Sequence, residues 1–319
     1  MPKAKHTITF NSNGGTTNEE TKIVTEGTKI GQLPVATRED YEFGGWYTEE
    51  DVEVTSDTLM GNTDITYFAH WEININSDSS MTLKQAIEKV KTDGIQVEIN
   101  MTKNMQDNVT IADNQNILLN LHGNTLNTAK SGNVNVVVNN GTLEIINGSI
   151  TSNASYSIID NNSTGTLIIK DTRVVASNKQ AICNQGGGSC YIEGNSYISS
   201  GSAYTIDNRK GTVTITGGTV KGIIHEAINN QGTLIIGTKD GNVNINSPII
   251  QAGTNKNAVK NEGSTYFYDG TVKGVSQQAF NKEYNIKETE SGYTLKKEQE
   301  VIDGTTYNLM YLEAINTNN

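Results

Sequence analysis

The residues whose types and spacing could support catalysis are few. His225 is followed by Glu226, and a histidine beside a carboxylate could transfer protons as an acid–base pair. In a β-strand, however, neighbouring side chains point to opposite faces, so we expect these two residues not to act together. His122 follows Leu121 in an earlier strand-like segment, with no acidic residue at the equivalent place in adjacent repeats. We expect both histidines to be structural.

Cleavage of a polysaccharide would need a different set of residues. A lyase needs carboxylates that bind Ca²⁺ and a nearby Arg or Lys as base. Arg173 and Arg209 are the only arginines in the repetitive part of the chain, and no trio of aspartates at equivalent positions accompanies either. We therefore predict no catalytic residue, no metal and no cofactor. A deep groove that held Asp171, Glu193 and one of these arginines would contradict this prediction.

The two cysteines give no metal site and no disulfide framework. Cys190 takes the place of a core Leu or Val, whereas Cys183 takes the place of an outward-facing residue. The two should therefore diverge, and we expect two free thiols, with a disulfide as the alternative.

Composition excludes several partners. The formal net charge of the 319 residues is -11, and there are only three arginines, so no basic surface is available for nucleic acid or for an anionic membrane. No apolar run is long enough to span a membrane, and the first residues lack the apolar segment of a signal peptide. We expect an export signal and an anchor, if used, to lie outside this sequence, or the protein to assemble into a virion.

The elements that must position these side chains are short strands that repeat about every 22 residues. Three alternating segments per period, joined by Gly and Asn corners, are typical of a parallel β-helix, in which equivalent residues of successive coils stack. Two apolar rows are expected inside: Leu143, Leu167, Cys190, Val213, Leu234 and Thr265, and Ile158, Ile182, Ile206, Ile228, Val259 and Phe280. A structural ladder is expected at one corner: Asn139, Asp160, Asn184, Asn208, Asn230 and Asn261.

One outward row could bind a partner. It reads Glu144, Ile168, Tyr191, Thr214, Ile235 and Tyr266, and a second outward row ends in Tyr268. Apolar and aromatic side chains on one exposed face could form a patch suited to a protein or a glycan. The candidate binding residues are Ile168, Tyr191, Ile235, Tyr266 and Tyr268. The alternative is that such residues simply pack well on an exposed sheet.

Other segments flank the array. Thr82 and Gln85 fit a capping box at the start of a helix over 82–93. This helix would cover the open end of the first coil, and the β-helix including it would extend over 81–283. Residues 73–80 are predicted to be a linker. Residues 284–319 are predicted to form short antiparallel strands and a tail that close the last coil.

Residues 1–72 predict a separate all-β unit. A first strand runs into Asn11-Ser12-Asn13-Gly14-Gly15, and Leu33-Pro34, Thr37-Arg38 and Gly45-Trp46-Tyr47-Thr48 follow before a strand that ends in Trp71. This order resembles the Listeria–Bacteroides, or internalin B-type, repeat. The resemblance implies a small β-grasp-like module of bacterial surface proteins. Trp46 and Trp71 are expected in its core.

The later repeats resemble the pectate-lyase-like right-handed β-helices, and Thr212–Val220 is the closest stretch. The fold class is therefore all-β. Because this scaffold serves many functions, fold alone does not give the function. We expect a non-catalytic extracellular adhesin or stalk segment at the bacterial cell surface, with a surface protein or glycan as partner and oligomers possible. The alternatives are a phage fibre or tailspike-like protein and a diverged polysaccharide lyase or hydrolase.

Overall fold

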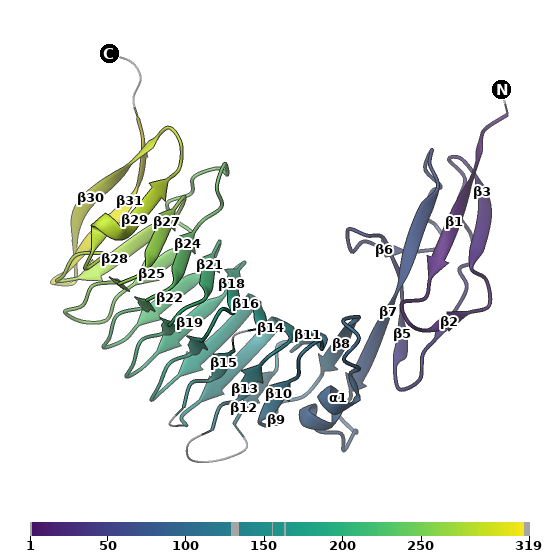
Figure 1. The fold of residues 1–319 in the computed structure, drawn as a ribbon, viewed down its shortest axis with the longest axis horizontal. Helices are drawn as coiled ribbons and strands as arrows, with labels where there is room; N and C mark the ends of the chain where they lie inside the picture. Colours follow the sequence, from purple (N-terminus) through teal and green to yellow (C-terminus); the bar gives the residue numbers. More distant parts are fainter. Residues whose placement is uncertain (1, 129–133, 155, 163, 316–319) are drawn as a thin grey trace.

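The computed structural model describes residues 2–128, 134–154, 156–162 and 164–315. It has the shape of a V, in which the N-terminal unit forms one arm and a parallel β-helix forms the other (Figure 1). The two arms meet around a short α-helix, Leu83–Lys89, at the foot of the V (Figure 1).

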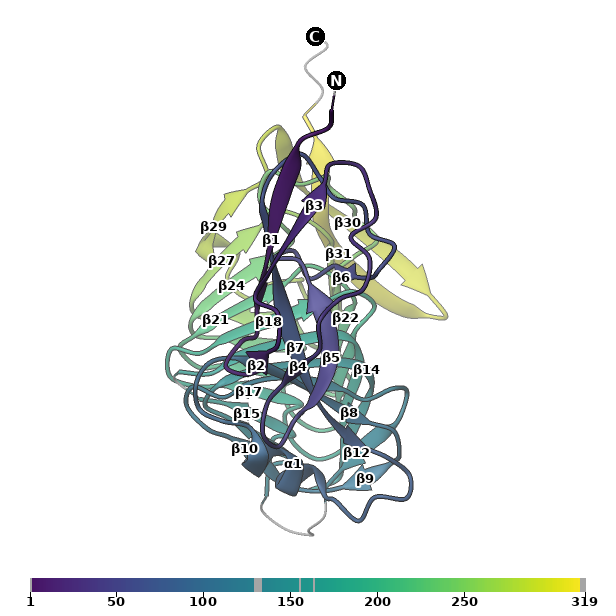
Figure 2. The same cartoon turned by 90° about the vertical axis from the view of Figure 1, so that its right-hand side faces the viewer.

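The N-terminal unit is a mixed sheet whose strands lie in the order β3, β1, β7, β5, β6. Its elements are β1 (Lys5–Asn11), β2 (Thr16–Thr17), β3 (Thr21–Thr25), β4 (Ala36–Thr37), β5 (Glu42–Tyr47), β6 (Glu53–Val54) and β7 (Ile65–Ile75). Figure 2 views this arm from its outer side. Trp46 and Trp71 are each 1% exposed and pack with Phe10 and Phe43, so both tryptophans lie in the core as predicted.

Strand β7 joins the two arms. Its first residues pair with β1, and its last residues, from Trp71 to Ile75, pair in parallel with β8. Residues 73–75 thus belong to a strand rather than to the predicted linker, because Ile73 and Ile75 are buried in the core next to β8. The N-terminal unit therefore supplies the first rung of the β-helix.

The helix α1 (Leu83–Lys89) caps the first coil. The predicted capping box is present, since Thr82 Oγ1 accepts a hydrogen bond from the Gln85 amide and Gln85 Oε1 accepts one from the Thr82 amide. The helix ends at Lys89, four residues earlier than predicted, because Val90 is already extended. Leu83, Ala86 and Ile87 are its buried face.

The β-helix has three faces. The first carries β8 (Gln96–Met101), β11 (Asn116–Asn120), β18 (Ser189–Glu193), β21 (Thr212–Ile215), β24 (Thr233–Ile236), β27 (Ser264–Phe267) and the first halves of β14 (Thr142–Ser152) and β16 (Thr166–Ala176). The second carries β9 (Met105–Gln106), β12 (Thr125–Asn127), β19 (Tyr197–Ser200), β22 (Thr219–Gly222), β25 (Ile249–Gln251), β28 (Thr271–Val275) and the second halves of β14 and β16. The third is a seven-stranded sheet of β10 (Val109–Ile111), β13 (Val137–Asn139), β15 (Ile159–Asn161), β17 (Ile182–Asn184), β20 (Ile206–Asn208), β23 (Ile228–Asn230) and β26 (Val259–Asn261).

The corners between the faces of the β-helix are formed by residues that tolerate a left-handed backbone conformation. β14 and β16 bend at Asn147 (φ 57°) and Asp171 (φ 48°), and in the next two coils Gly194 and Gly218 occupy the same corner with positive φ. Asn, Asp and Gly adopt this conformation most readily. Each coil can therefore turn without breaking the stack.

The apolar rows stack inside as predicted. Leu143, Leu167, Cys190, Val213, Leu234 and Thr265 are aligned and at most 1% exposed. In the second row the rung before Ile182 is Ile159 rather than Ile158, although both isoleucines are fully buried. Phe280 ends this row beside Val259.

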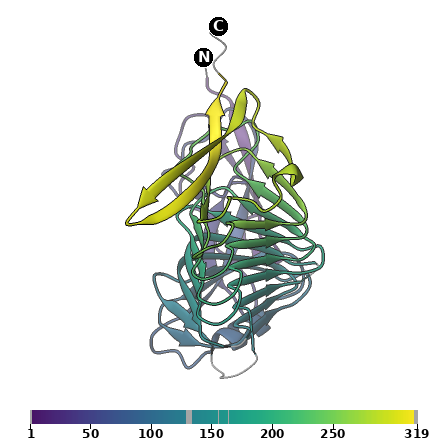
Figure 3. The ribbon, with the colours of Figure 1, turned by 90° about the vertical axis from the view of Figure 1, so that its left-hand side faces the viewer.

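The C-terminal end is closed by η1 (Glu283–Asn285), β29 (Ile286–Thr289), β30 (Tyr293–Ile302) and β31 (Thr305–Ala314). β31 pairs antiparallel with β28, and the hairpin β30–β31 projects beyond the last coil (Figure 3). β29, however, pairs in parallel with β27, so it extends the first face instead of forming an antiparallel strand as predicted.

Candidate functional site

The predicted binding row lies on the first face of the β-helix, which is the inner side of the V (Figure 1). Glu144, Ile168, Tyr191, Thr214, Ile235 and Tyr266 are directly aligned from coil to coil. Each is half-buried, so each presents part of its side chain to solvent. Parallel strands lie about 4.8 Å apart, so these side chains form one continuous strip, called the inner row below.

Tyr268 does not belong to this surface. It is only 6% exposed, although it was predicted to face outward. The added strand β29 brings Glu288 against Tyr266, and Glu288 also pairs with Lys239 at 2.5 Å. The C-terminal closure thus covers Tyr268 and leaves Tyr266 at the upper end of the row.

The inner row continues toward the N-terminus past Glu144. Leu118, Glu98 and Glu72 are aligned with it on β11, β8 and β7. Burial raises the pKa of Glu72 and of Glu144, and for Glu72 the neighbouring Glu98 and Glu42 raise it further. The row is therefore acidic at its foot and apolar above it.

Two adjoining cavities lie at this foot. One, of about 110 Å³, is lined among others by Tyr47, His70 and Glu98, and the other, of about 350 Å³, by Glu144 and Lys170. They share Asp51, Gln96 and Leu118. The cavities thus form one groove between the N-terminal unit and the first coils, and sequence reasoning missed it.

The asparagine ladder is present inside one corner. Asn139, Asn161, Asn184, Asn208, Asn230 and Asn261 are fully buried, and each Nδ2 donates to the Oδ1 of the next at 2.8–3.0 Å. Asn161, not the predicted Asp160, is the second rung, because β15 is aligned one residue later. A carboxylate only accepts hydrogen bonds, so an ionised Asp160 could not have passed the ladder on to Asn184.

Asp160 lies instead in an outward row with Cys183 and Asp207. Asp207 accepts a hydrogen bond from Arg209 Nε at 2.9 Å. Cys183 is 2% exposed and Cys190 is fully buried; both are free thiols, and burial raises the pKa of each to about 12. Neither thiol is accessible or ionised enough to act as a nucleophile at neutral pH.

Asp171 lines the groove at the foot of the V, but neither of the two arginines considered for polysaccharide cleavage does. Arg209 lies on the third face beside Asp207, whereas Arg173 stacks over Tyr197 with its guanidinium carbon 4.4 Å from the ring centre. Asp171 accepts a hydrogen bond from the Asn195 amide. Within the described ranges, no three His, Cys, Asp or Glu side chains gather where they could hold a metal ion.

The histidines differ from expectation in one respect. His225 and Glu226 lie in a turn rather than in a strand, so their side chains meet, with Nδ1 3.6 Å from Oε2. Lys256 is 4.0 Å from Glu226, and Tyr204 packs edge-on against His225. His122 Nε2 lies 2.6 Å from Asn100 Oδ1, and in the part of the chain that the structure describes it forms no ion pair with a carboxylate.

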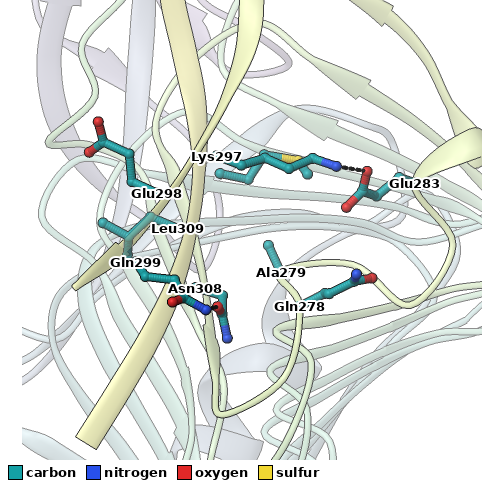
Figure 4. A pocket seen from close by; sticks show the side chains of 9 residues that line it. Gln278, Ala279, Glu283, Lys297, Glu298, Gln299, Asn308 and Leu309 are labelled. Carbon is teal, nitrogen blue, oxygen red and sulfur yellow. Dashed lines mark hydrogen bonds and ion pairs between the residues drawn. The ribbon is translucent and has the colours of Figure 1, made fainter. Parts of the chain in front are cut away.

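A further cavity, of about 260 Å³, lies under the C-terminal hairpin (Figure 4). Four of its polar side chains are paired with each other: Lys297 pairs with Glu283, and Gln299 donates to Asn308 Oδ1 at 2.8 Å.

Residues 6–70 match the Listeria-Bacteroides repeat domain family. This repeat is followed by a parallel β-helix, and the repeat family is typical of bacterial surface proteins. A comparison with curated proteins and one with solved structures found no significant match. In the part of the chain that the structure describes, no helix is long and apolar enough to cross a membrane.

Proposed function

We propose that the protein is a non-catalytic surface-displayed binding protein, an adhesin or stalk segment whose inner row contacts a partner protein or glycan. The observation that carries the proposal is that Ile168 is aligned with Tyr191, and Ile235 with Tyr266, as half-exposed rungs of one face, with Thr214 between the two pairs. Apolar and aromatic side chains gathered on one exposed face often mark a surface that binds a partner.

The arrangement of the two arms supports the same proposal. The repeat and the β-helix share strand β7, so the inner row is held at a fixed place relative to the N-terminal arm. A rigid array that presents one side chain per coil is suited to an extended partner.

The test is retention of the purified chain on wells coated with mucin, collagen or fibronectin. The double variant I168D/Y191D should lose retention, because two charges at the centre of the row disrupt an apolar contact. Tyr197→Asp is the matched control, since Tyr197 is a half-buried tyrosine on the second face. Retention that I168D/Y191D leaves unchanged would reject the proposal.

A further inference from the structure

The groove at the foot of the inner row is built by both arms. Asp51 comes from the loop between β5 and β6 of the repeat, whereas Gln96 and Leu118 come from β8 and β11 of the first coils. These three residues line both cavities, so the two cavities adjoin each other. Neither arm alone would form this site.

One wall of the groove is a fixed aromatic pair. The rings of Tyr47 and His70 are stacked, with centres 3.8 Å apart and planes 11° from parallel. His70 Nε2 lies 3.3 Å from Asp51 Oδ1, which holds the imidazole in place. Burial lowers the pKa of His70, which favours the uncharged form of its ring.

The polar groups of the groove are spread along it instead of converging. Glu98 accepts a hydrogen bond from Asn120 at 3.0 Å, and Asp171 accepts one from the Asn195 amide at 2.8 Å. Among the described residues no three acids come close enough to hold a metal ion. Gln96 and Asn147 add amide groups, which donate as well as accept.

We propose that this groove binds an uncharged oligosaccharide. A sugar ring has an apolar face that packs on aromatic side chains and many separate hydroxyls that suit dispersed carboxylates and amides. Four carboxylates line the two cavities (Asp51, Glu98, Glu144 and Asp171) beside one lysine, Lys170, so uronates and sulfated sugars are repelled. This inference rests on the proposed function, because it names the ligand class for the foot of the inner row.

The test is calorimetric titration of the full chain with tetrasaccharides and a peptide of defined charge. The probes are cellotetraose, maltotetraose and chitotetraose as uncharged sugars, tetragalacturonate as the acidic one, and tetralysine as a cationic peptide. We expect at least one uncharged sugar to bind and tetragalacturonate not to bind. Tyr47→Ala should weaken that binding by about tenfold or more, because it removes a ring contact. Glu98→Gln should weaken it by a similar factor, because it removes a charged hydrogen-bond acceptor.

Tyr197→Ala is the matched control, and it should leave the affinity unchanged. Far-UV circular dichroism checks that Tyr47→Ala is folded. If Tyr47→Ala unfolds, Glu98→Gln still tests the inference, because it keeps the shape of the side chain. Binding of tetralysine or tetragalacturonate in preference to every uncharged sugar would overturn the inference, as would binding that survives both substitutions or no binding of any uncharged sugar. If these outcomes occur while I168D/Y191D still abolishes retention on coated wells, the groove inference fails and the proposed function stands.

Discussion

The asparagine ladder makes one prediction that follows directly from its direction. Asn184 lies in the middle, where its Oδ1 accepts from Asn161 at 2.8 Å and its Nδ2 donates to Asn208 at 3.0 Å. Asn139 lies at the end, where its Nδ2 donates to Asn161 but its buried Oδ1 has no hydrogen-bond partner among the described residues. Replacing each by alanine should therefore have unequal effects.

The expected difference can be worked from these bonds. Asn184→Ala leaves the buried Oδ1 of Asn208 without its donor and also removes donations to the carbonyls of Gly188 and Thr212. A buried group left unpaired costs about 1–3 kcal/mol and each hydrogen bond contributes about 1 kcal/mol, so we expect a loss of about 3–5 kcal/mol in the free energy of unfolding. Asn139→Ala removes an acceptor that is already unpaired, which offsets part of its cost, so we expect a loss of about 1–2 kcal/mol.

The assay is urea unfolding followed by far-UV circular dichroism, with stabilities compared at an unchanged slope of the transition. Asp160→Ala is the control, because Asp160 is half-buried in the neighbouring outward row, and it should cost less than about 1 kcal/mol. Hydrogen exchange should show that the loss in Asn184→Ala is centred on β17 and β20. Equal destabilisation by Asn184→Ala and Asn139→Ala would refute the idea that the ladder acts as a directed chain.

Two further predictions concern the foot of the V. Glu72→Gln should raise the midpoint of thermal unfolding at pH 7 but not below about pH 4. Burial and neighbouring carboxylates raise the pKa of Glu72 in the folded protein above its value in the unfolded chain. The ionised carboxylate therefore destabilises the fold when the pH is above the unfolded-state pKa, and this cost is absent once Glu72 is protonated. Asp93→Ala should destabilise the junction by about 3 kcal/mol, because the Arg38 side chain, which is 2% exposed, loses its counter-charge. Trp fluorescence, which reports only the repeat, should then show unfolding at a lower urea concentration than circular dichroism does. Adding Arg38→Met should restore much of the lost stability.

The stacked core could be predicted from the sequence because its signal repeats. Leu143, Leu167 and Val213 recur in the same local pattern, and one period fixes which residues face each other. The register of β15 could not be obtained in this way. Ile158 and Ile159 are both fully buried, so apolar patterning does not distinguish two alignments that differ by one residue. The chemistry of the ladder does, since only an amide both accepts and donates, and this argument would have selected Asn161 from sequence.

Features that depend on contacts between distant segments escaped sequence reasoning. Tyr268 follows the period but is covered by β29, which belongs to a non-repeating segment. The groove brings Tyr47 and Asp51 of the repeat to Leu118 of the second coil, and no periodic signal connects these positions. The contact between His225 and Glu226 arises because the chain turns where continued alternation was assumed.

At the junction, the repeat helps to cover and hold the first coil of the β-helix. A solenoid exposes its core at its first coil unless something covers it. Here α1 covers the interior while β7 pairs with the edge of β8, and Arg38 of the repeat forms an ion pair with Asp93 after the helix. Tyr41 Oη donates to the Lys89 carbonyl and accepts from the Lys91 amide, both at 2.9 Å, so the end of α1 is held by the repeat as well. Because the same contacts that cap the coil also fix the angle between the arms, the groove and the inner row keep their relative positions only while the cap is intact.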